Sequence, residues 1–217
     1  KRYADYGYKD FVIALGYKAE IIKNYFASYH LGQSDFTVSL SSGQTVMSSN
    51  GDSDWNVTLV DTGINTMTGG RIKRLRDHLK DESFMLTYGD GVADVNIRQL
   101  TEHHFNSNNL VTLTAVRPTA RFGELELNDD LVTNFQEKSQ LNAGWVNGGF
   151  FVCEPQILDF IENDSIMLER EPLEKVAAQS RLGAFKHHGF WQCMDSKRDR
   201  DLLESLYDEG KRLWLEI

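Results

Sequence analysis

The sequence predicts an α/β fold, with a doubly wound mixed sheet and a small antiparallel β lobe beside it. Short continuous apolar runs, typical of strands buried on both faces, alternate along the chain with segments whose apolar residues recur at helical spacing. Residues 124 to 135 predict an inserted hairpin around the turn Asn128-Asp129-Asp130. Ligands of such sheets collect at the carboxyl ends of strands, so the residues that follow strands are the first candidates for a site.

The first part of the chain predicts a strand and a crossover helix, and then strands with one wet face. The apolar run 10–15 predicts a buried strand. Alternating apolar residues predict further strands at 36–40 and 55–59. We expect Thr68 to be the N-cap of a second helix, since its hydroxyl can accept from an amide of the first turn. The apolar positions at helical spacing are Ile21, Ile22, Tyr25, Phe26 and Tyr29 in the first helix, and Ile72, Leu75 and Leu79 in the second.

The rest of the chain continues the alternation of strands and helices. The buried run 83–88 predicts a strand that leads directly into Gly89-Asp90-Gly91. The remaining elements are expected at 96–105 (helix), 110–117 (strand), 145–153 (strand), 156–161 (short helix), 182–186 (strand) and in a C-terminal amphipathic helix that carries Leu202, Leu203, Leu206 and Tyr207.

Composition and charge exclude several classes of partner. The chain has 217 residues, 41% of them hydrophobic, and 32 acidic against 23 basic residues give a formal charge of -9. We therefore expect neither nucleic acid nor an anionic membrane as a partner, because both are bound by basic surfaces. No apolar run is long enough to span a bilayer. Cys153 and Cys193 match no metal spacing and form no disulfide framework, which favours a reducing cytoplasm.

Two acids are the candidates for a metal site. Asp90 follows a buried strand between two glycines, which let a ligand approach closely, and its carboxylate suits Mg²⁺. The alternative is an Asp-Gly turn without a ligand. Asp195 stands at the entry to the last helix, where the alternative is an N-cap. Two carboxylates on one Mg²⁺ that also carries substrate phosphates would be an arrangement for phosphoryl transfer.

Other segments could bind phosphate or sugar, although each also has a simpler interpretation. Glu137-Lys138 offers a carboxylate and an ammonium, but surface Glu-Lys pairs are common. Gly69-Gly70-Arg71 offers free amides and a guanidinium at a helix start, or only a cap with a solvated arginine. Asn147-Gly148-Gly149 and Arg121-Phe122-Gly123 predict either close backbone approach or turns. The adjacent pairs His103-His104 and His187-His188 are expected at the surface, and the sequence contains no nucleophile elbow, P-loop or cysteine cluster.

Six segments occur in an order that resembles a known family. Together they closely resemble the glucose-1-phosphate cytidylyltransferase branch of the sugar nucleotidylyltransferases, over residues 7 to 214. The resemblance implies a Rossmann-like nucleotidyltransferase fold that fills residues 1–217 as one domain, with a sugar-binding β lobe at about 120–150. The segments run from Trp55 to Gly63, Met67 to Arg71, Thr87 to Asp94, Phe135 to Lys138, Asn147 to Phe151 and Gly189 to Asp195.

The resemblance also implies a reaction and a set of site residues. CTP and α-D-glucose 1-phosphate would give CDP-glucose and pyrophosphate with Mg²⁺, in the cytoplasmic synthesis of lipopolysaccharide O-antigen and in a homo-oligomer. Asp90 and Asp195 match the family's metal ligands, and Asp90 and Lys138 its catalytic groups. Thr66, Arg71 and Gly89 match nucleotide contacts. Gly123, Glu137, Lys138 and Asn147 match positions around the sugar phosphate.

One family motif has no counterpart here. The N-terminal glycine-rich loop, Gly-Gly-x-Gly-Thr-Arg, and the Lys-Pro segment after it would lie before Lys1. We expect this segment to precede the given chain, since the strand at 11–15 would otherwise be central with no first strand beside it. Two alternatives stay open: a uridylyl- or thymidylyltransferase of the same family, and a sugar-nucleotide-binding homologue without catalysis.

Overall fold

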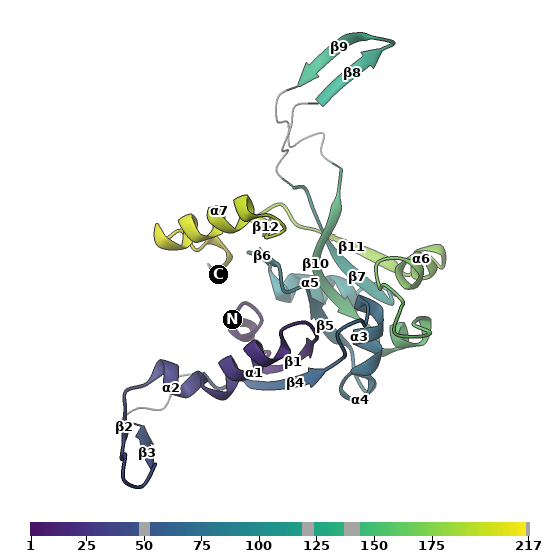
Figure 1. Cartoon of the computed structure of the whole chain (residues 1–217). Helices are drawn as coiled ribbons and strands as arrows, with labels where there is room; N and C mark the ends of the chain where they lie inside the picture. Colours follow the sequence, from purple (N-terminus) through teal and green to yellow (C-terminus); the bar gives the residue numbers. More distant parts are fainter. Residues whose placement is uncertain (48–52, 119–123, 137–143, 216–217) are drawn as a thin grey trace.

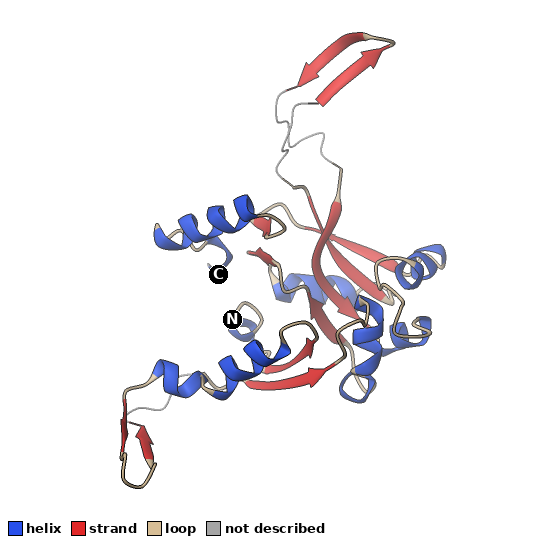
Figure 2. Ribbon diagram, viewed as in Figure 1, coloured by secondary structure: helices blue, strands red, loops and turns tan. Residues whose placement is uncertain are grey.

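The computed structural model describes residues 1–47, 53–118, 124–136 and 144–215, and it confirms the predicted α/β class. Strands and helices alternate along much of the chain (Figures 1 and 2). In chain order the elements are η1 (Ala4–Tyr6), β1 (Asp10–Leu15), α1 (Ala19–Ala27), α2 (Tyr29–Gln33), β2 (Phe36–Val38), β3 (Thr45–Met47), β4 (Asn56–Asp61), α3 (Thr68–Arg74), α4 (Arg76–Leu79), β5 (Phe84–Thr87), β6 (Gly91–Ala93), α5 (Ile97–Phe105), β7 (Val111–Val116), β8 (Glu124–Asn128), β9 (Leu131–Gln136), β10 (Val146–Cys153), η2 (Pro155–Phe160), α6 (Glu171–Ala178), β11 (Leu182–Lys186), β12 (Trp191–Cys193), α7 (Lys197–Asp208) and η3 (Leu213–Leu215).

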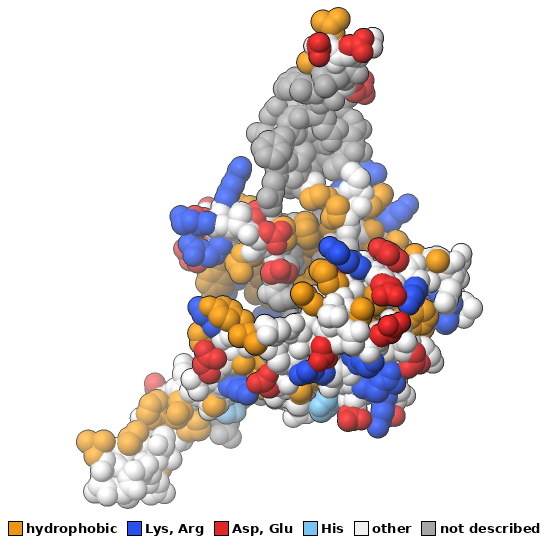
Figure 3. Space-filling model, turned by 45° about the vertical axis from the view of Figure 1, so that its right-hand side comes forward, with side chains coloured by type: hydrophobic (Ala, Val, Ile, Leu, Met, Phe, Trp, Pro, Cys, Tyr) orange, Lys and Arg blue, Asp and Glu red, His pale blue; other side chains and the backbone are white. Residues whose placement is uncertain are grey.

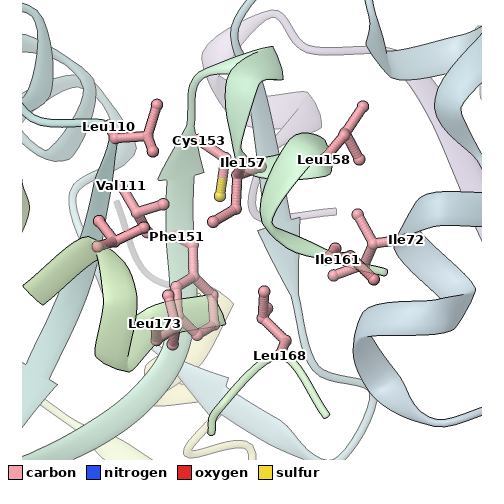
Figure 4. Close-up of a cluster of buried hydrophobic side chains, with 11 residues drawn as sticks. Ile72, Leu110, Val111, Phe151, Cys153, Ile157, Leu158, Ile161, Leu168 and Leu173 are labelled. Atoms are coloured by element: carbon pink, nitrogen blue, oxygen red, sulfur yellow. The ribbon is translucent and has the colours of Figure 1, made fainter. Parts of the chain in front are cut away.

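A mixed four-stranded sheet forms the centre of the molecule. Its strand order is β11-β7-β10-β5, with β11 parallel to β7 and with β10 antiparallel to both of its neighbours. From Phe150 to Cys153, β10 is buried on both faces, because helices and η2 cover the sheet. Phe151 lies at the centre of the main hydrophobic core, and Figure 4 shows it among side chains from α3, β7, η2 and α6. This core fixes the ends of β5 and β10, from which the site residues extend.

A second pair of strands lies beside that sheet. β1 and β4 are parallel, with Asp10 opposite Asn56 and Leu15 opposite Asp61. The strand at 10–15 was expected to be buried on both faces, but only Leu15 is buried, and Phe11 to Ala14 are partly exposed. The reason is its position: among the described strands β1 pairs only with β4.

Two hairpins extend from the body (Figure 1). The expected hairpin is present as β8 and β9, with Glu124 opposite Gln136. The expected strand at 36–40 pairs as β2 with β3, and all of its residues are exposed rather than having one buried face. Figure 3 shows apolar side chains gathered over the arm that α1, α2, β2 and β3 form.

Several local predictions need correction. Thr68 is the first residue of α3 and not its N-cap, which is Met67, because the Thr68 hydroxyl bonds to Glu169 and Leu168 instead. His104 was expected at the surface but is 1% exposed. It lies on the inner face of α5, where its Nδ1 is 2.8 Å from Thr112 Oγ1 and its Nε2 is 3.0 Å from Glu154 Oε1.

The other histidine pair is also partly inside. The His187 side chain is 9% exposed and its Nε2 lies 2.9 Å from Asp94 Oδ1. The α6 helix was not predicted, since Pro172 at its start interrupts the helical pattern, although Pro is well tolerated in a first turn. No helix in the described part of the chain is both long and apolar enough to cross a membrane.

Candidate active site

The candidate site is a pocket of about 280 Å³ where β5 and β10 meet the short β6–β12 pair. Three of the predicted residues, Asp90, Asn147 and Asp195, line it together. Asp90 follows β5 and lines this pocket, at the kind of position where the strand-end rule predicts a ligand. The complete lining is Tyr88, Asp90, Gly91, Asn147, Gly148, Trp191, Cys193 and Asp195.

A two-stranded ladder holds the two acids on one side of the pocket. β6 and β12 are antiparallel, with Gly91 opposite Cys193. One step further, Met194 N donates to Asp90 O at 2.7 Å. Backbone pairing therefore brings Asp90 next to the residue before Asp195, although the two acids are far apart in the sequence.

Asp195 is not the cap of the last helix, which was its alternative interpretation. The N-cap of α7 is Ser196, in a capping box with Asp199: Asp199 N donates to Ser196 Oγ at 3.3 Å, and Ser196 N donates to Asp199 Oδ2 at 3.1 Å. The carboxylate of Asp195 is thus not needed to cap the helix and lines the pocket instead.

Two glycines bring the backbone of β10 close to its neighbours. A Cβ added at Gly148 would lie 2.8 Å from Val116 Cγ1, and one at Gly149 would lie 2.9 Å from Tyr88 Cδ2. Gly149 also has φ +79°, which L side chains rarely adopt. Of the two interpretations of Asn147-Gly148-Gly149, close approach is therefore the one that the structure supports.

The same segment aims Asn147 into the pocket. The β7–β10 register shifts between Asn147 and Phe151, and such a bulge redirects side chains. Gly149 N donates to Asn147 Oδ1 at 2.9 Å, and Asn147 Nδ2 donates to Tyr88 Oη at 3.4 Å. These two bonds hold the amide in one orientation.

Trp191 forms a wall that the sequence did not predict. Its Nε1 donates to Gly148 O at 2.8 Å, which ties β12 to β10 across the pocket. The signal for it was weak, because an aromatic residue in a short strand more often indicates core packing. The register of β6 and β12 was needed to place it.

Burial and nearby carboxylates raise the pKa of two groups in the pocket. Burial, and then the hydrogen bond with Asp195, raise the pKa of the Cys193 thiol. Burial, together with the bond to Glu169, raises the pKa of the Tyr88 hydroxyl well above its ordinary value. Both groups therefore stay protonated at neutral pH, and Tyr88 acts as a hydrogen-bond donor.

The two acids fit a hard cation that shares its coordination with a ligand. Carboxylate oxygens suit Mg²⁺, which is usually held by one or two carboxylates and by substrate phosphates. Among the residues that the structure describes, no group of three or more His, Cys, Asp or Glu side chains could hold a metal ion. Asp90 and Asp195 would thus need phosphate oxygens or water to complete a metal site.

The predicted nucleotide residues lie mainly elsewhere. Arg71 Nη1 donates to Leu15 O at 3.0 Å and to Thr62 Oγ1 at 2.7 Å, at the carboxyl ends of β1 and β4. Its guanidinium covers Gly16, where an added Cβ would lie 2.5 Å from Arg71 Nη1. The alternative of a solvated arginine is therefore wrong, because this side chain joins two strands.

Thr66 is 8% exposed, and Gly89 connects β5 to Asp90 with open space around its α carbon. Neither residue lines the pocket. Gly123, Glu137 and Lys138 lie outside the described residues. Their predicted contacts with the sugar phosphate stay predictions.

Comparison with solved structures confirms the fold class. HddC from Yersinia pseudotuberculosis matches with a TM-score of 0.64 at 18% identity, over 95% of this chain and 82% of that one. UDP-glucose pyrophosphorylase complexed with UDP-glucose matches with a TM-score of 0.65 at 13% identity, over 96% and 84%. The fold, with acids at the strand ends, is that of the nucleotidyltransferases.

Sequence comparison gives the particular family. Glucose-1-phosphate cytidylyltransferase of Salmonella typhimurium is 46% identical over 215 residues, which cover 99% of this chain and 84% of that protein. The probable glucose-1-phosphate cytidylyltransferase of Bacillus subtilis is 35% identical over the same shares. No protein-family model matches the chain. The chain belongs to the glucose-1-phosphate cytidylyltransferase family, and the resemblance seen in its six segments is confirmed.

Proposed function

We propose that this chain transfers a cytidylyl group from CTP to α-D-glucose 1-phosphate, giving CDP-glucose and pyrophosphate, at the pocket that Asp90, Asn147 and Asp195 line. The observation that carries the proposal is the 46% identity with a glucose-1-phosphate cytidylyltransferase over 99% of the chain. The pocket supports it, because its two acids lie at strand ends, where this fold class binds ligands.

The reaction needs alignment and charge neutralisation. A phosphate oxygen of glucose 1-phosphate attacks the α-phosphorus of CTP in line, the new P–O bond forms, and the bond to the β-phosphate breaks to release pyrophosphate. A phosphate monoester is largely ionised near pH 7, so no general base is required. Both reactants are anions, and the protein contributes by holding them in line and by stabilising the charge that develops.

Nucleotidyltransferases generally use a divalent metal ion. We propose that the ion is Mg²⁺ and that Asp90 and Asp195 hold it. When bound, Mg²⁺ would neutralise charge on phosphate oxygens. Asp90 directly precedes β6 and Asp195 follows β12 by two residues, and the paired strands together with the bond from Met194 N to Asp90 O bring the two acids together.

The remaining roles are proposals for individual residues. Asn147 would bind a glucose hydroxyl, since it is polar, oriented and in the pocket. Glu137 and Gly123 would contact the sugar, and Lys138 its phosphate. Thr66, Arg71 and Gly89 would bind the nucleotide. A homo-oligomer and a cytoplasmic location, where CTP is made, complete the proposal.

The test is pyrophosphate release by the full-length protein with glucose 1-phosphate and, in turn, CTP, UTP and dTTP. We expect CTP to be used with the highest kcat/KM and CDP-glucose to be the product. Faster turnover of UTP or dTTP would replace the cytidylyl assignment by another base. Binding of CDP-glucose without turnover of any nucleotide would instead indicate a homologue without catalysis.

A further inference from the structure

A continuous chain of hydrogen bonds leads from the pocket to the start of α3. Asn147 Nδ2 donates to Tyr88 Oη at 3.4 Å, and Tyr88 Oη donates to Glu169 Oε1 at 2.5 Å. On the other side of that carboxylate, Thr68 Oγ1 donates to Glu169 Oε2 at 2.6 Å. Leu168 N donates to Thr68 Oγ1 at 2.9 Å and completes the chain. Glu169 thus joins a pocket side chain to the first residue of α3.

The chemistry of these groups fixes the direction of every bond. An ionised carboxylate only accepts, so both hydroxyls must donate to Glu169. The Tyr88 oxygen then accepts from Asn147 Nδ2, while Gly149 N, which can only donate, faces Asn147 Oδ1.

This arrangement determines what Asn147 offers to a ligand. A neutral amide has two N–H donors and an oxygen with two lone pairs. Within the described part of the chain, Tyr88 takes one donor and Gly149 N takes one lone pair. One N–H and one lone pair of this pocket-lining amide are left for a ligand, and a sugar hydroxyl, which both donates and accepts, matches that pair.

Packing keeps Glu169 in place. The start of α3 packs against the segment that precedes Glu169 in the chain. Met67 N donates to Asp164 O at 2.8 Å, and Gly70 N donates to Ile166 O at 3.2 Å. A Cβ added at Gly69 would lie 2.8 Å from Ile166 O, so the two backbones are in direct contact. On the pocket side, the Tyr88 ring packs against Phe151 with 5.5 Å between centroids.

We propose that Glu169 is a positioning residue, which acts through Tyr88 to hold the Asn147 amide in the orientation that binds the glucose hydroxyl. It also couples this amide to the segment 66–71, where the nucleotide contacts are predicted. The proposal rests on the function proposed above, because glucose 1-phosphate must be the ligand of the pocket. Glu169 does not line the pocket, so we expect its effect to fall on the KM for the sugar through Asn147.

The experiment uses the full-length protein and steady-state kinetics for both substrates. Tyr88→Phe leaves Asn147 Nδ2 without its acceptor, and we expect the KM for glucose 1-phosphate to rise about 10-fold. The kcat and the KM for CTP should change by less than about 3-fold, since the ring and its packing are kept. Tyr17→Phe, at a tyrosine that is 73% exposed, is the matched control and should have no effect.

The other end of the chain is tested by a rescue pair. Thr68→Val removes the hydroxyl but keeps the shape, and it should raise the same KM by a few-fold, roughly the effect of one hydrogen bond. Thr68→Ser restores the hydroxyl and should restore the KM. Glu169→Ala should reproduce Tyr88→Phe, whereas Glu174→Ala, at an exposed carboxylate on α6, should not.

A double-mutant cycle decides whether the residues act in series. If Tyr88 works through Asn147, then Tyr88→Phe adds nothing to the defect of Asn147→Ala. Additive effects, or a Glu169→Ala variant with a wild-type KM for glucose 1-phosphate, would overturn the positioning role while the proposed function stands. A wild-type protein that turns over no glucose 1-phosphate would instead overturn the proposed function, and this inference with it.

Discussion

The pocket at β5 and β10 and the strand ends of β1 and β4 both carry predicted site residues, but they use charge differently. In the pocket, Asp90 and Asp195 project from backbone positions that β6 and β12 fix, and no described side chain forms an ion pair with either. At β1 and β4, the Arg71 guanidinium bonds to Leu15 O and Thr62 Oγ1. A charged side chain near the end of a strand can thus be available to a ligand or be used by the fold, and its hydrogen bonds distinguish the two cases.

The largest difference between the two regions should follow from Asp90→Asn. We expect turnover to fall by about 10³-fold or more, because the change removes a charge that would act on the phosphates. The midpoint of thermal unfolding should stay unchanged, since Asp90 is exposed. Asp81→Asn, before the same strand, is the control. Unchanged turnover would mean that Asp90 is no metal ligand.

A loss of stability is expected at Arg71, because its side chain joins two strands. Arg71→Ala leaves two acceptors without their donor, so the free energy of unfolding should fall by about 2 kcal/mol, as measured by urea denaturation. Arg71→Lys keeps the charge but cannot donate to both acceptors from one planar group. It should recover less than half of the stability that Arg71→Ala loses. If stability were unchanged and only the KM for CTP rose, Arg71 would serve only as the proposed nucleotide contact, and the two regions would be alike.

The pocket side also has one fold-determining position, at Gly149. Gly149→Ala should lower the free energy of unfolding by about 1–3 kcal/mol, because the position has a positive φ and the added Cβ would contact the Tyr88 ring. Gly210→Ala is the matched control, with φ +76° and nothing within 4 Å of the added Cβ. The stability difference between the two variants isolates the contact. Equal losses of stability in the two variants would show that the Tyr88 ring moves to accommodate the added Cβ.

The smallest expected effect concerns Asp195 and Asp199, two acids near the start of α7 that should have different roles. Asp199→Ala removes half of the capping box and should lower the free energy of unfolding by about 1 kcal/mol with turnover retained. Asp195→Asn should instead lower turnover and leave the free energy of unfolding unchanged. Loss of turnover in both variants would indicate that the cap itself positions the pocket.

The sequence indicated the two acids of the pocket, but it did not indicate the hydrogen bonds that hold the surrounding side chains in place. Asp90 was predictable because an apolar run typical of a strand precedes it and a glycine stands on each side of it. The strand-end rule needs no knowledge of a distant partner. Thr68 looked like an N-cap in local sequence, but its hydroxyl bonds to Glu169, about a hundred positions along the chain. Tyr88, Glu169 and Trp191 act through such distant pairings, and only the folded chain shows them.

The same limit explains the histidines and the burial of β1. His104 is inside because α5 turns one member of an adjacent pair toward Glu154, and the sequence does not say which face is inner. The apolar run of β1 predicted two covered faces, and pairing with β4 alone leaves most of it partly exposed. Local pattern gave the element in each case, while burial depended on neighbours.

The ladder between β6 and β12 has a consequence for how the protein is made. Two of the segments that line the pocket, 88–91 and 191–195, lie far apart in the sequence, and Met194 must reach Asp90 to join them. Contacts so distant in sequence form late in folding, since the loop between them must close first. A chain still emerging from the ribosome would therefore have a folded sheet before it has a site. The pocket would be complete only when Trp191 meets Gly148.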